Sequence, residues 1–109
     1  MNTYIVMLDF TRWGVETIKD SHKRSQIMSA ALDKFGARIK DFYLTLGDHD
    51  FVVIFEAPDD KTMAKILLEI GRLGAVTTST MRAFTKDEFG EIVAELPEKG
   101  LFDDLKPKS

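Results

Sequence analysis

The chain has 109 residues, of which 44% are hydrophobic and 30% charged, so it can fold as one domain and is not intrinsically disordered. It contains no cysteine, which excludes disulfide frameworks, thiolate catalysis, zinc ribbons and iron–sulfur clusters. The net charge of −3 argues against a general nucleic-acid or anionic-membrane binder.

The charges are unevenly distributed along the chain. Residues 11–40 hold seven lysines and arginines against three acids, whereas residues 41–109 hold eight against fourteen. A basic helix of this kind could steer an anion or match one subunit to another. The alternative, an ordinary solvated helix face, is the more common situation.

The first half of the chain predicts a strand, a helix and a hairpin. Residues 4–10 are mostly apolar, aromatic or β-branched, as in a strand. A short amphipathic piece over 15–19 leads to a helix that begins near Ser21 and ends before Gly36. Its apolar stripe consists of Ile27, Met28, Ala31, Leu32 and Phe35. Residues 37–46 and 51–56 predict two strands joined by the turn over 47–50.

The next segment predicts a second helix and a fourth strand. Asp59 or Asp60 is expected to cap the helix, and Gly71 with Gly74 to close it. Residues 76–84 form a threonine-rich strand. The buried face of the helix is expected to consist of Met63, Ile66, Leu67 and Ile70.

A last helix is predicted at the carboxyl end, followed by a tail. Thr85 and Glu88 have the spacing of a capping box, and Pro97 ends the run. The side chains expected to face the core are Phe89, Ile92, Val93 and Leu96. We divide the chain into a domain over residues 1–97 and a tail over 98–109. The tail is expected to dock on its own subunit or on a neighbour through Leu101, Phe102 and Leu105.

The element order β-α-β-β-α-β plus a carboxyl-terminal helix predicts an α+β, ferredoxin-like fold. Two helices can cover only one face of its sheet, yet residues 51–55 are apolar on both faces. A second copy of the same sheet is the simplest cover, so we expect a homodimer that pairs sheet to sheet as a dimeric α/β-barrel.

Several separated segments within residues 3–95 resemble the GYD domain family. They are Thr3-Tyr4-Ile5-Val6, residues 19–24, residues 42–47, residues 50–60 and Met81-Arg82-Ala83-Phe84-Thr85. Members are generally uncharacterised, and the resemblance implies a dimeric α/β-barrel of ferredoxin-like units. Where the family pattern has tyrosine before Asp50, this chain has His49. A role that needs a phenol would not carry over, whereas one that needs a flat, polar-tipped ring would.

The turn residues His49 and Asp50 are the candidate catalytic groups. Histidine titrates near neutral pH, and neighbouring carboxylates could fix its tautomer for general-base work. The alternative is that the turn residues simply shape the hairpin, with Asp50 accepting backbone N–H bonds. One subunit has only two histidines, so no metal site is expected.

Four further residues are candidate ligand-binding groups. Trp13 could line a pocket mouth, or else cover the core or a dimer contact. Arg24 lies in the first turn of a helix, where a cation is unfavourable, and this points to a functional role. Arg82 in a neutral strand is expected to meet an acid, in an ion pair or on a ligand. Tyr43 lies in one of the segments that resemble the family.

Two functions from different classes remain open. The first is a small homo-oligomeric domain that binds a small organic ligand in the cavity between helices and sheet. The second, by analogy with other dimeric α/β-barrels, is a cofactor-independent, monooxygenase- or isomerase-like enzyme acting on a small organic substrate. We expect no cofactor, nucleic-acid partner or membrane association. The amino terminus lacks the features of a signal peptide, so the expected location is cytoplasmic.

Overall fold

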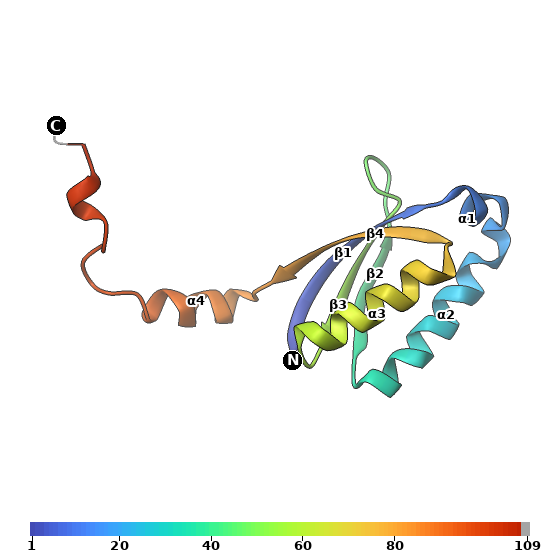
Figure 1. Cartoon of the computed structure of the whole chain (residues 1–109), viewed down its shortest axis with the longest axis horizontal. Coiled ribbons are helices and arrows are strands. Elements are labelled where there is room, and N and C mark those ends of the chain that lie inside the picture. Colours follow the sequence, from blue (N-terminus) through green and yellow to red (C-terminus); the bar gives the residue numbers. More distant parts are fainter. Residues whose placement is uncertain (108–109) are drawn as a thin grey trace.

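The computed structural model describes residues 1–107 as a four-stranded sheet, two helices packed on it, and a helical arm that leaves it (Figure 1). The elements follow in the order β1 (Asn2–Phe10), α1 (Arg12–Glu16), α2 (Ser21–Ala31), β2 (Arg38–Leu44), β3 (Phe51–Ala57), α3 (Asp60–Leu73), β4 (Val76–Ala83) and α4 (Lys86–Ala94). Short 3-10 turns lie at Ile18–Asp20, Leu32–Phe35 and Asp103–Leu105.

The sheet has the strand order β2-β3-β1-β4, with every neighbouring pair antiparallel. Hairpin β2–β3 and the two strand–helix–strand crossovers place the longest strand, β1, beside both β3 and β4. This arrangement confirms the α+β, ferredoxin-like fold.

The core lies between the sheet and two helices. Tyr4, Val6 and Leu8 alternate along β1 toward the helices, because successive side chains of a strand point to opposite faces. Helix α3 buries Met63, Ile66 and Ile70 against them at helical spacing, as predicted. From α2 and its 3-10 extension, Leu32 is buried, while Met28 and Phe35 are partly buried; Val53, Phe55 and Ala57 complete the core from β3.

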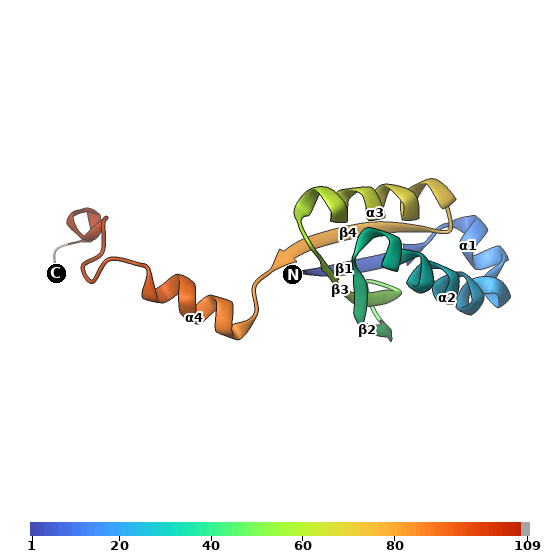
Figure 2. The same ribbon diagram turned by 90° about the horizontal axis from the view of Figure 1, so that it is seen from below.

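Part of the predicted α2 stripe does not reach the core. Ile27 is 60% exposed, and Ala31 is also exposed. Helices α2 and α3 stand apart over the sheet (Figure 2), so these two residues face the space between the helices.

The helix ends follow the local sequence signals closely. Asp59 caps α3 by accepting a bond from the Thr62 N–H, 2.8 Å. Hydrogen bonding from Thr62, first from its side chain and then from this N–H, lowers the pKa of the Asp59 carboxyl. Gly36 and Gly74 end their helices in the left-handed region, with φ of 66° and 84°. The prediction for Gly71 is wrong: α3 continues through it to Leu73.

The second face of the sheet carries an apolar patch, here termed the open sheet face: Ile5, Met7, Tyr43, Val52, Ile54 and Met81. The registers place Ile54, Ile5 and Met81 in one row across the strands, and Tyr43, Val52 and Met7 in the next. No helix within residues 1–107 packs on this face, and Met81 is 49% exposed. Residues 51–55 are therefore apolar on both faces of the sheet, as the sequence indicated.

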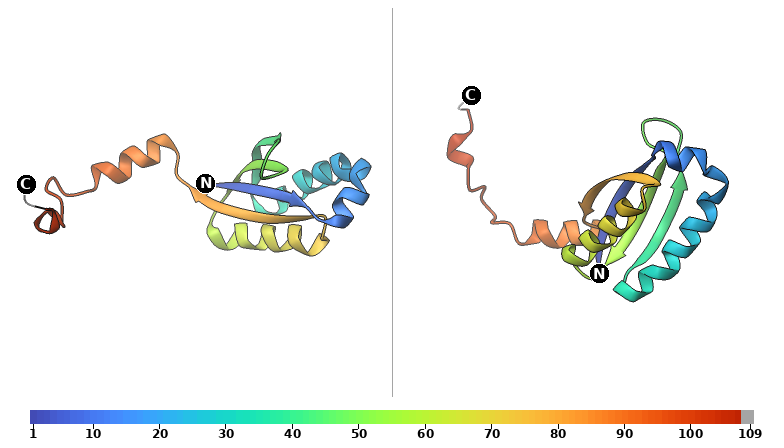
Figure 3. Two further views of the ribbon diagram at one scale, coloured as in Figure 1. Left: turned by 90° about the horizontal axis from the view of Figure 1, so that it is seen from above. Right: turned by 45° about the vertical axis from the view of Figure 1, so that its right-hand side comes forward.

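Helix α4 forms with its predicted capping box but does not pack on the core. Thr85 accepts from the Glu88 N–H, and Glu88 accepts from the Thr85 N–H, which lowers the pKa of the Glu88 carboxyl. The prediction that its apolar residues face inward is wrong. Only Phe84 and Thr85 separate β4 from α4, and the helix continues outward from the strand (Figure 3). The exposed row consists of Phe89, Ile92, Val93 and Leu96.

The tail beyond α4 also stays clear of the domain. Leu101, Phe102 and Leu105 are all at least 72% exposed, so the described part of the tail, residues 98–107, does not dock on its own subunit. Residues 108–109 of the expected tail lie outside the described residues. The arm gives the described chain principal extents of 60 × 32 × 20 Å.

Candidate functional site

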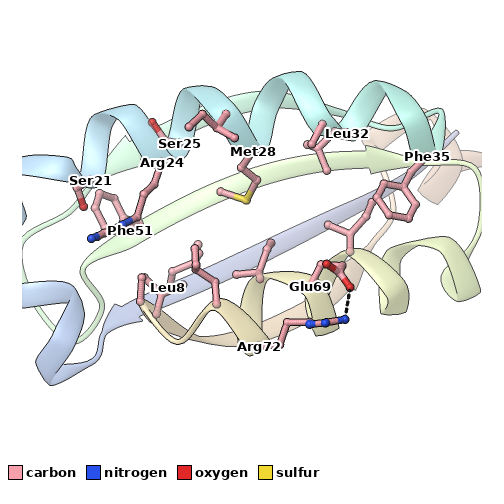
Figure 4. A pocket seen from close by; sticks show the side chains of 17 residues that line it. Leu8, Ser21, Arg24, Ser25, Met28, Leu32, Phe35, Phe51, Glu69 and Arg72 are labelled. Atoms are coloured by element: carbon pink, nitrogen blue, oxygen red, sulfur yellow. Dashed lines mark hydrogen bonds and ion pairs between the residues drawn. The ribbon is translucent and has the colours of Figure 1, made fainter. Parts of the chain in front are cut away.

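A groove of about 630 Å³ lies between α2 and α3, with the sheet as its floor (Figure 4). This is the position in which the sequence placed a ligand cavity. Its walls are largely apolar, from Met28, Leu32 and Phe35 on one side to Ile66, Ile70 and Leu73 on the other. A groove of this volume and composition is in the range of small-molecule sites.

Few polar groups line the groove, and they are segregated. Ser21, Arg24 and Ser25 come from the first turns of α2 and lie at one end (Figure 4). Glu69 and Arg72 lie on α3, where they pair with each other at 3.0 Å. Sequence reasoning singled out Arg24 but missed the two serines, although they flank it within one helical turn.

Arg24 is held by aromatic and polar contacts. Its guanidinium lies 4.4 Å from the ring centroid of Trp13, a cation–π distance. Its Nη2 donates to the Thr17 hydroxyl and lies 4.0 Å from an Asp20 carboxylate oxygen. The structure thus brings together two of the candidate residues, Trp13 and Arg24, at the polar end of the groove.

The His49–Asp50 turn is tied to the end of β1. His49 Nδ1 lies 3.1 Å from Asp9 Oδ2, and Asp50 Oδ2 accepts from the Phe10 N–H at 2.8 Å. The Asp50 N–H in turn donates to Asp9 Oδ1 at 3.1 Å. Asp50 therefore accepts a backbone N–H bond, as the structural interpretation of the turn predicts. The histidine pairs with Asp9, which sequence reasoning missed although it is the one acid in an apolar strand.

Arg82 forms the ion pair expected of it. Its Nε lies 3.9 Å from Asp60 Oδ1, and its guanidinium lies 4.4 Å from the Phe84 ring centroid. Tyr4 donates its hydroxyl to the same Asp60 oxygen at 2.5 Å. Burial, and then this bond, raise the pKa of the Tyr4 phenol. The cluster lies where β1 and β4 meet the start of α3, away from the groove.

Tyr43 lies apart from the groove, the His49 turn and the Arg82 cluster. It lies on the open sheet face opposite Val52 and is 57% exposed. The candidate residues are thus spread over four places. Among them Arg24 lines the groove, and Trp13 packs against Arg24.

Residues 1–107 contain neither a cluster of metal ligands nor a helix suited to a membrane. No three side chains of histidine, aspartate and glutamate in this part of the chain converge in a way that would hold a metal ion. None of the helices in the same residues is both long and apolar enough to cross a membrane.

Comparison with known proteins identifies the family. The sequence pattern of the GYD domain matches residues 4–93. The chain belongs to the GYD domain family. A relative from Thermus thermophilus is named "Glutamine synthetase and cystathionine beta-lyase binding protein". It is 36% identical over 84 residues, which are 76% of this chain and 88% of the relative.

A solved structure supports the fold of this GYD domain. The crystal structure of TTHA0845, also from Thermus thermophilus, matches with a TM-score of 0.51 and 21% sequence identity. The match covers 78% of this chain and 95% of that one. At this identity the likeness concerns the fold alone.

Proposed function

We propose that this GYD domain is a protein-binding module that docks on an enzyme through α4. The observation that carries the proposal is an apolar row formed by Phe89, Ile92 and Val93 on α4 and continued by Leu96 just beyond the end of the helix. All four residues are at least 41% exposed, on an arm that leaves the domain. Amphipathic helices commonly bind by laying such a row into a groove of a partner.

Two further features support this role. Residues 85–105 carry seven acids against two lysines, so a partner with a basic-rimmed apolar groove would complement the arm. The relative from Thermus thermophilus is named as a binding protein for glutamine synthetase and cystathionine β-lyase. These two enzymes, taken from the organism that carries this chain, are the partners we propose.

The test is direct binding to each purified enzyme, measured by surface plasmon resonance. Phe89→Ser combined with Ile92→Ser should weaken binding at least tenfold, because interface energy concentrates in buried large side chains. Gly90→Ala is the matched control: its Cβ would meet open space and would favour the helix, so affinity should be kept or improved. Absence of binding to both enzymes, or full binding by the double variant, would refute the proposal.

We infer that the module also self-associates, through the open sheet face. Ile5, Met7, Val52 and Ile54 form adjacent rows on the central strands, and a two-fold copy of the same patch would cover them. Native mass spectrometry should give a dimer for the unmodified chain. Ile54→Lys should give a monomer, whereas Ser29→Lys, on the exposed side of α2, should remain a dimer. A monomer of the unmodified chain at micromolar concentration would contradict the inference.

The α2–α3 groove favours a second candidate function, binding of a small organic ligand. Its support is the apolar volume of about 630 Å³ with the Arg24 end as its polar anchor. The alternative of an enzyme has its candidate groups at the His49 turn, where Asp9 and Asp50 are both engaged by backbone N–H groups. We favour a structural role for that turn. A cytoplasmic location remains part of the proposal, and cell fractionation tests it.

A further inference from the structure

We propose that the α2–α3 groove binds a carboxylate carried on an apolar chain, with Arg24 as the residue that pairs the carboxylate. This inference rests on the second candidate function, small-ligand binding, and names its ligand class. It is independent of the docking of α4 on an enzyme.

The groove is divided along its length in the way such a ligand requires. At one end stand Arg24, Ser21 and Ser25; beyond them the α2 wall is apolar through Met28 and Leu32 to Phe35. At about 1.5 Å of rise per residue through α2 and about 2.0 Å through the 3-10 turn, positions 24 and 35 are roughly 18 Å apart along the axis. An extended hydrocarbon chain would lie along this wall, with its charged end at Arg24.

The guanidinium of Arg24 is oriented before any ligand arrives. Trp13 stacks on one side of it and Thr17 accepts from Nη2, which leaves the side chain only 19% exposed. Its Nη1 is buried and has no hydrogen-bond partner anywhere in residues 1–107. A buried donor without an acceptor is costly, and a ligand carboxylate would supply the acceptor.

The surrounding charges favour a single negative charge over a phosphate dianion. Asp20 lies 4.0 Å from Nη2 of Arg24 and would repel a second negative charge. The second cation on the groove wall, Arg72, is already paired with Glu69. The Ser21 hydroxyl, on the same helix, is a neutral group that can donate to a carboxylate without adding charge, whereas the Ser25 hydroxyl already donates to the His22 carbonyl at 2.7 Å.

The test is calorimetric titration of the full chain with three compounds of equal chain length: decanoate, decan-1-ol and decylamine. Decanoate should bind at least tenfold more tightly than decan-1-ol, and decylamine should bind weakest. Trp13 is the chain's one tryptophan, so a change in its fluorescence on decanoate binding would locate the carboxylate at the Arg24 end.

Two variants separate the anchor from the apolar wall. Arg24→Gln should weaken decanoate at least tenfold and leave decan-1-ol unchanged, while Ala31→Phe, which fills the groove, should weaken both. Arg12→Gln is the matched control, because Arg12 is a solvated arginine of the same basic segment, and it should change neither affinity.

Each contrary result has a distinct meaning. Equal affinities for decanoate and decan-1-ol in the unmodified chain would overturn the carboxylate assignment and leave ligand binding standing. Unchanged decanoate binding in a folded Arg24→Gln variant would do the same. Failure of all three compounds to bind would overturn both this inference and the second candidate function.

Discussion

The two arginines that are most enclosed by their surroundings both lie against aromatic rings. Arg24 stacks on Trp13, and Arg82 stacks on Phe84 beside the ion pair with Asp60. A guanidinium is weakly hydrated and planar, so an aromatic face compensates part of its desolvation while leaving its N–H groups free to bond. The two arginines differ in their hydrogen bonding. Arg82 pairs with Asp60 and donates to the Ala83 carbonyl, whereas Nη1 of Arg24 has no acceptor within residues 1–107.

The phenol of Tyr4 is predicted to make the stability of the fold depend on pH. Burial, followed by the bond to Asp60, raises the pKa of the phenol above its ordinary value of 10.0. The folded state therefore holds the proton where the unfolded state releases it. The protonated phenol therefore contributes to the free energy of unfolding. This contribution is fully present below the pKa that Tyr4 has in the unfolded chain, and it is lost as the pH rises through the pKa that Tyr4 has in the folded chain.

Absorbance titration of a Tyr43→Phe variant, in which Tyr4 is the one remaining tyrosine, measures this pKa directly. The phenol should titrate above its ordinary value. Adding Asp60→Asn should lower the pKa only partly, because burial is the larger cause. A Tyr4 phenol that titrates at or below its ordinary value would contradict the prediction.

Gly14 yields a second prediction for a single residue. It is buried in α1, and a Cβ at this position would overlap the carbonyl oxygen of Ala75. That carbonyl also accepts from the Thr11 N–H at 3.0 Å, so it has little freedom to move. Gly14→Ala should lower the free energy of unfolding by roughly 1–3 kcal/mol, as overpacking usually does. Urea denaturation measures it, with Gly90→Ala as the unstrained control.

At the scale of elements, α3 and α4 are helices stabilised in different ways. Helix α3 combines an Asp59 cap with a buried apolar face, whereas α4 has its capping box and an apolar face in solvent. Short helices are marginal without tertiary packing, so the cap contributes a large share of the stability of α4.

Thr85→Ala should therefore fray α4 while leaving the sheet intact. Loss of an N-cap costs about 1 kcal/mol, which is substantial for a helix of nine residues without packing. Backbone chemical shifts over residues 86–94 report the loss. The control is Thr78→Ala on β4, a strand position outside α4. An unchanged α4 in the Thr85→Ala chain would show that contacts beyond the cap hold it.

For the whole molecule, the sheet separates two apolar surfaces. The helices and the groove lie on one face, and the open sheet face lies on the other. Because the β-sheet lies between them, the proposed self-association through one face and the proposed ligand binding on the other would not compete for the same residues. Helix α4 adds a third surface, which projects beyond the end of the sheet (Figure 1).

Amide hydrogen exchange tests this division. Amides of α4 should exchange far faster than those of α3, because opening α4 exposes no buried core, whereas opening α3 exposes Met63, Ile66 and Ile70. If the proposed enzyme docks on α4, its addition should slow exchange in residues 86–94. Equal protection of the two helices in the free chain would show that α4 packs somewhere in solution.

Features that depend on neighbouring residues could be predicted from the sequence. Periodicity and backbone chemistry within a few residues predict the strand and helix order, the cap at Thr85, a cap at Asp59 or Asp60, and the glycines at 36 and 74 that end helices. The run of apolar residues over 51–55, which makes both faces of this strand apolar, can also be read directly from the sequence. The several segments that resemble the GYD domain family also carried its identification.

Contacts between distant residues, and the covering of apolar faces, depend on how the elements pack in three dimensions. The pairing of His49 with Asp9, the stacking of Trp13 on Arg24 and the space in front of Ile27 and Ala31 depend on how separate elements are placed. The apolar row of α4 is the clearest case. Amphipathic spacing shows that a helix has an apolar face, but it does not state whether that face is covered by the same domain, by another molecule or by water.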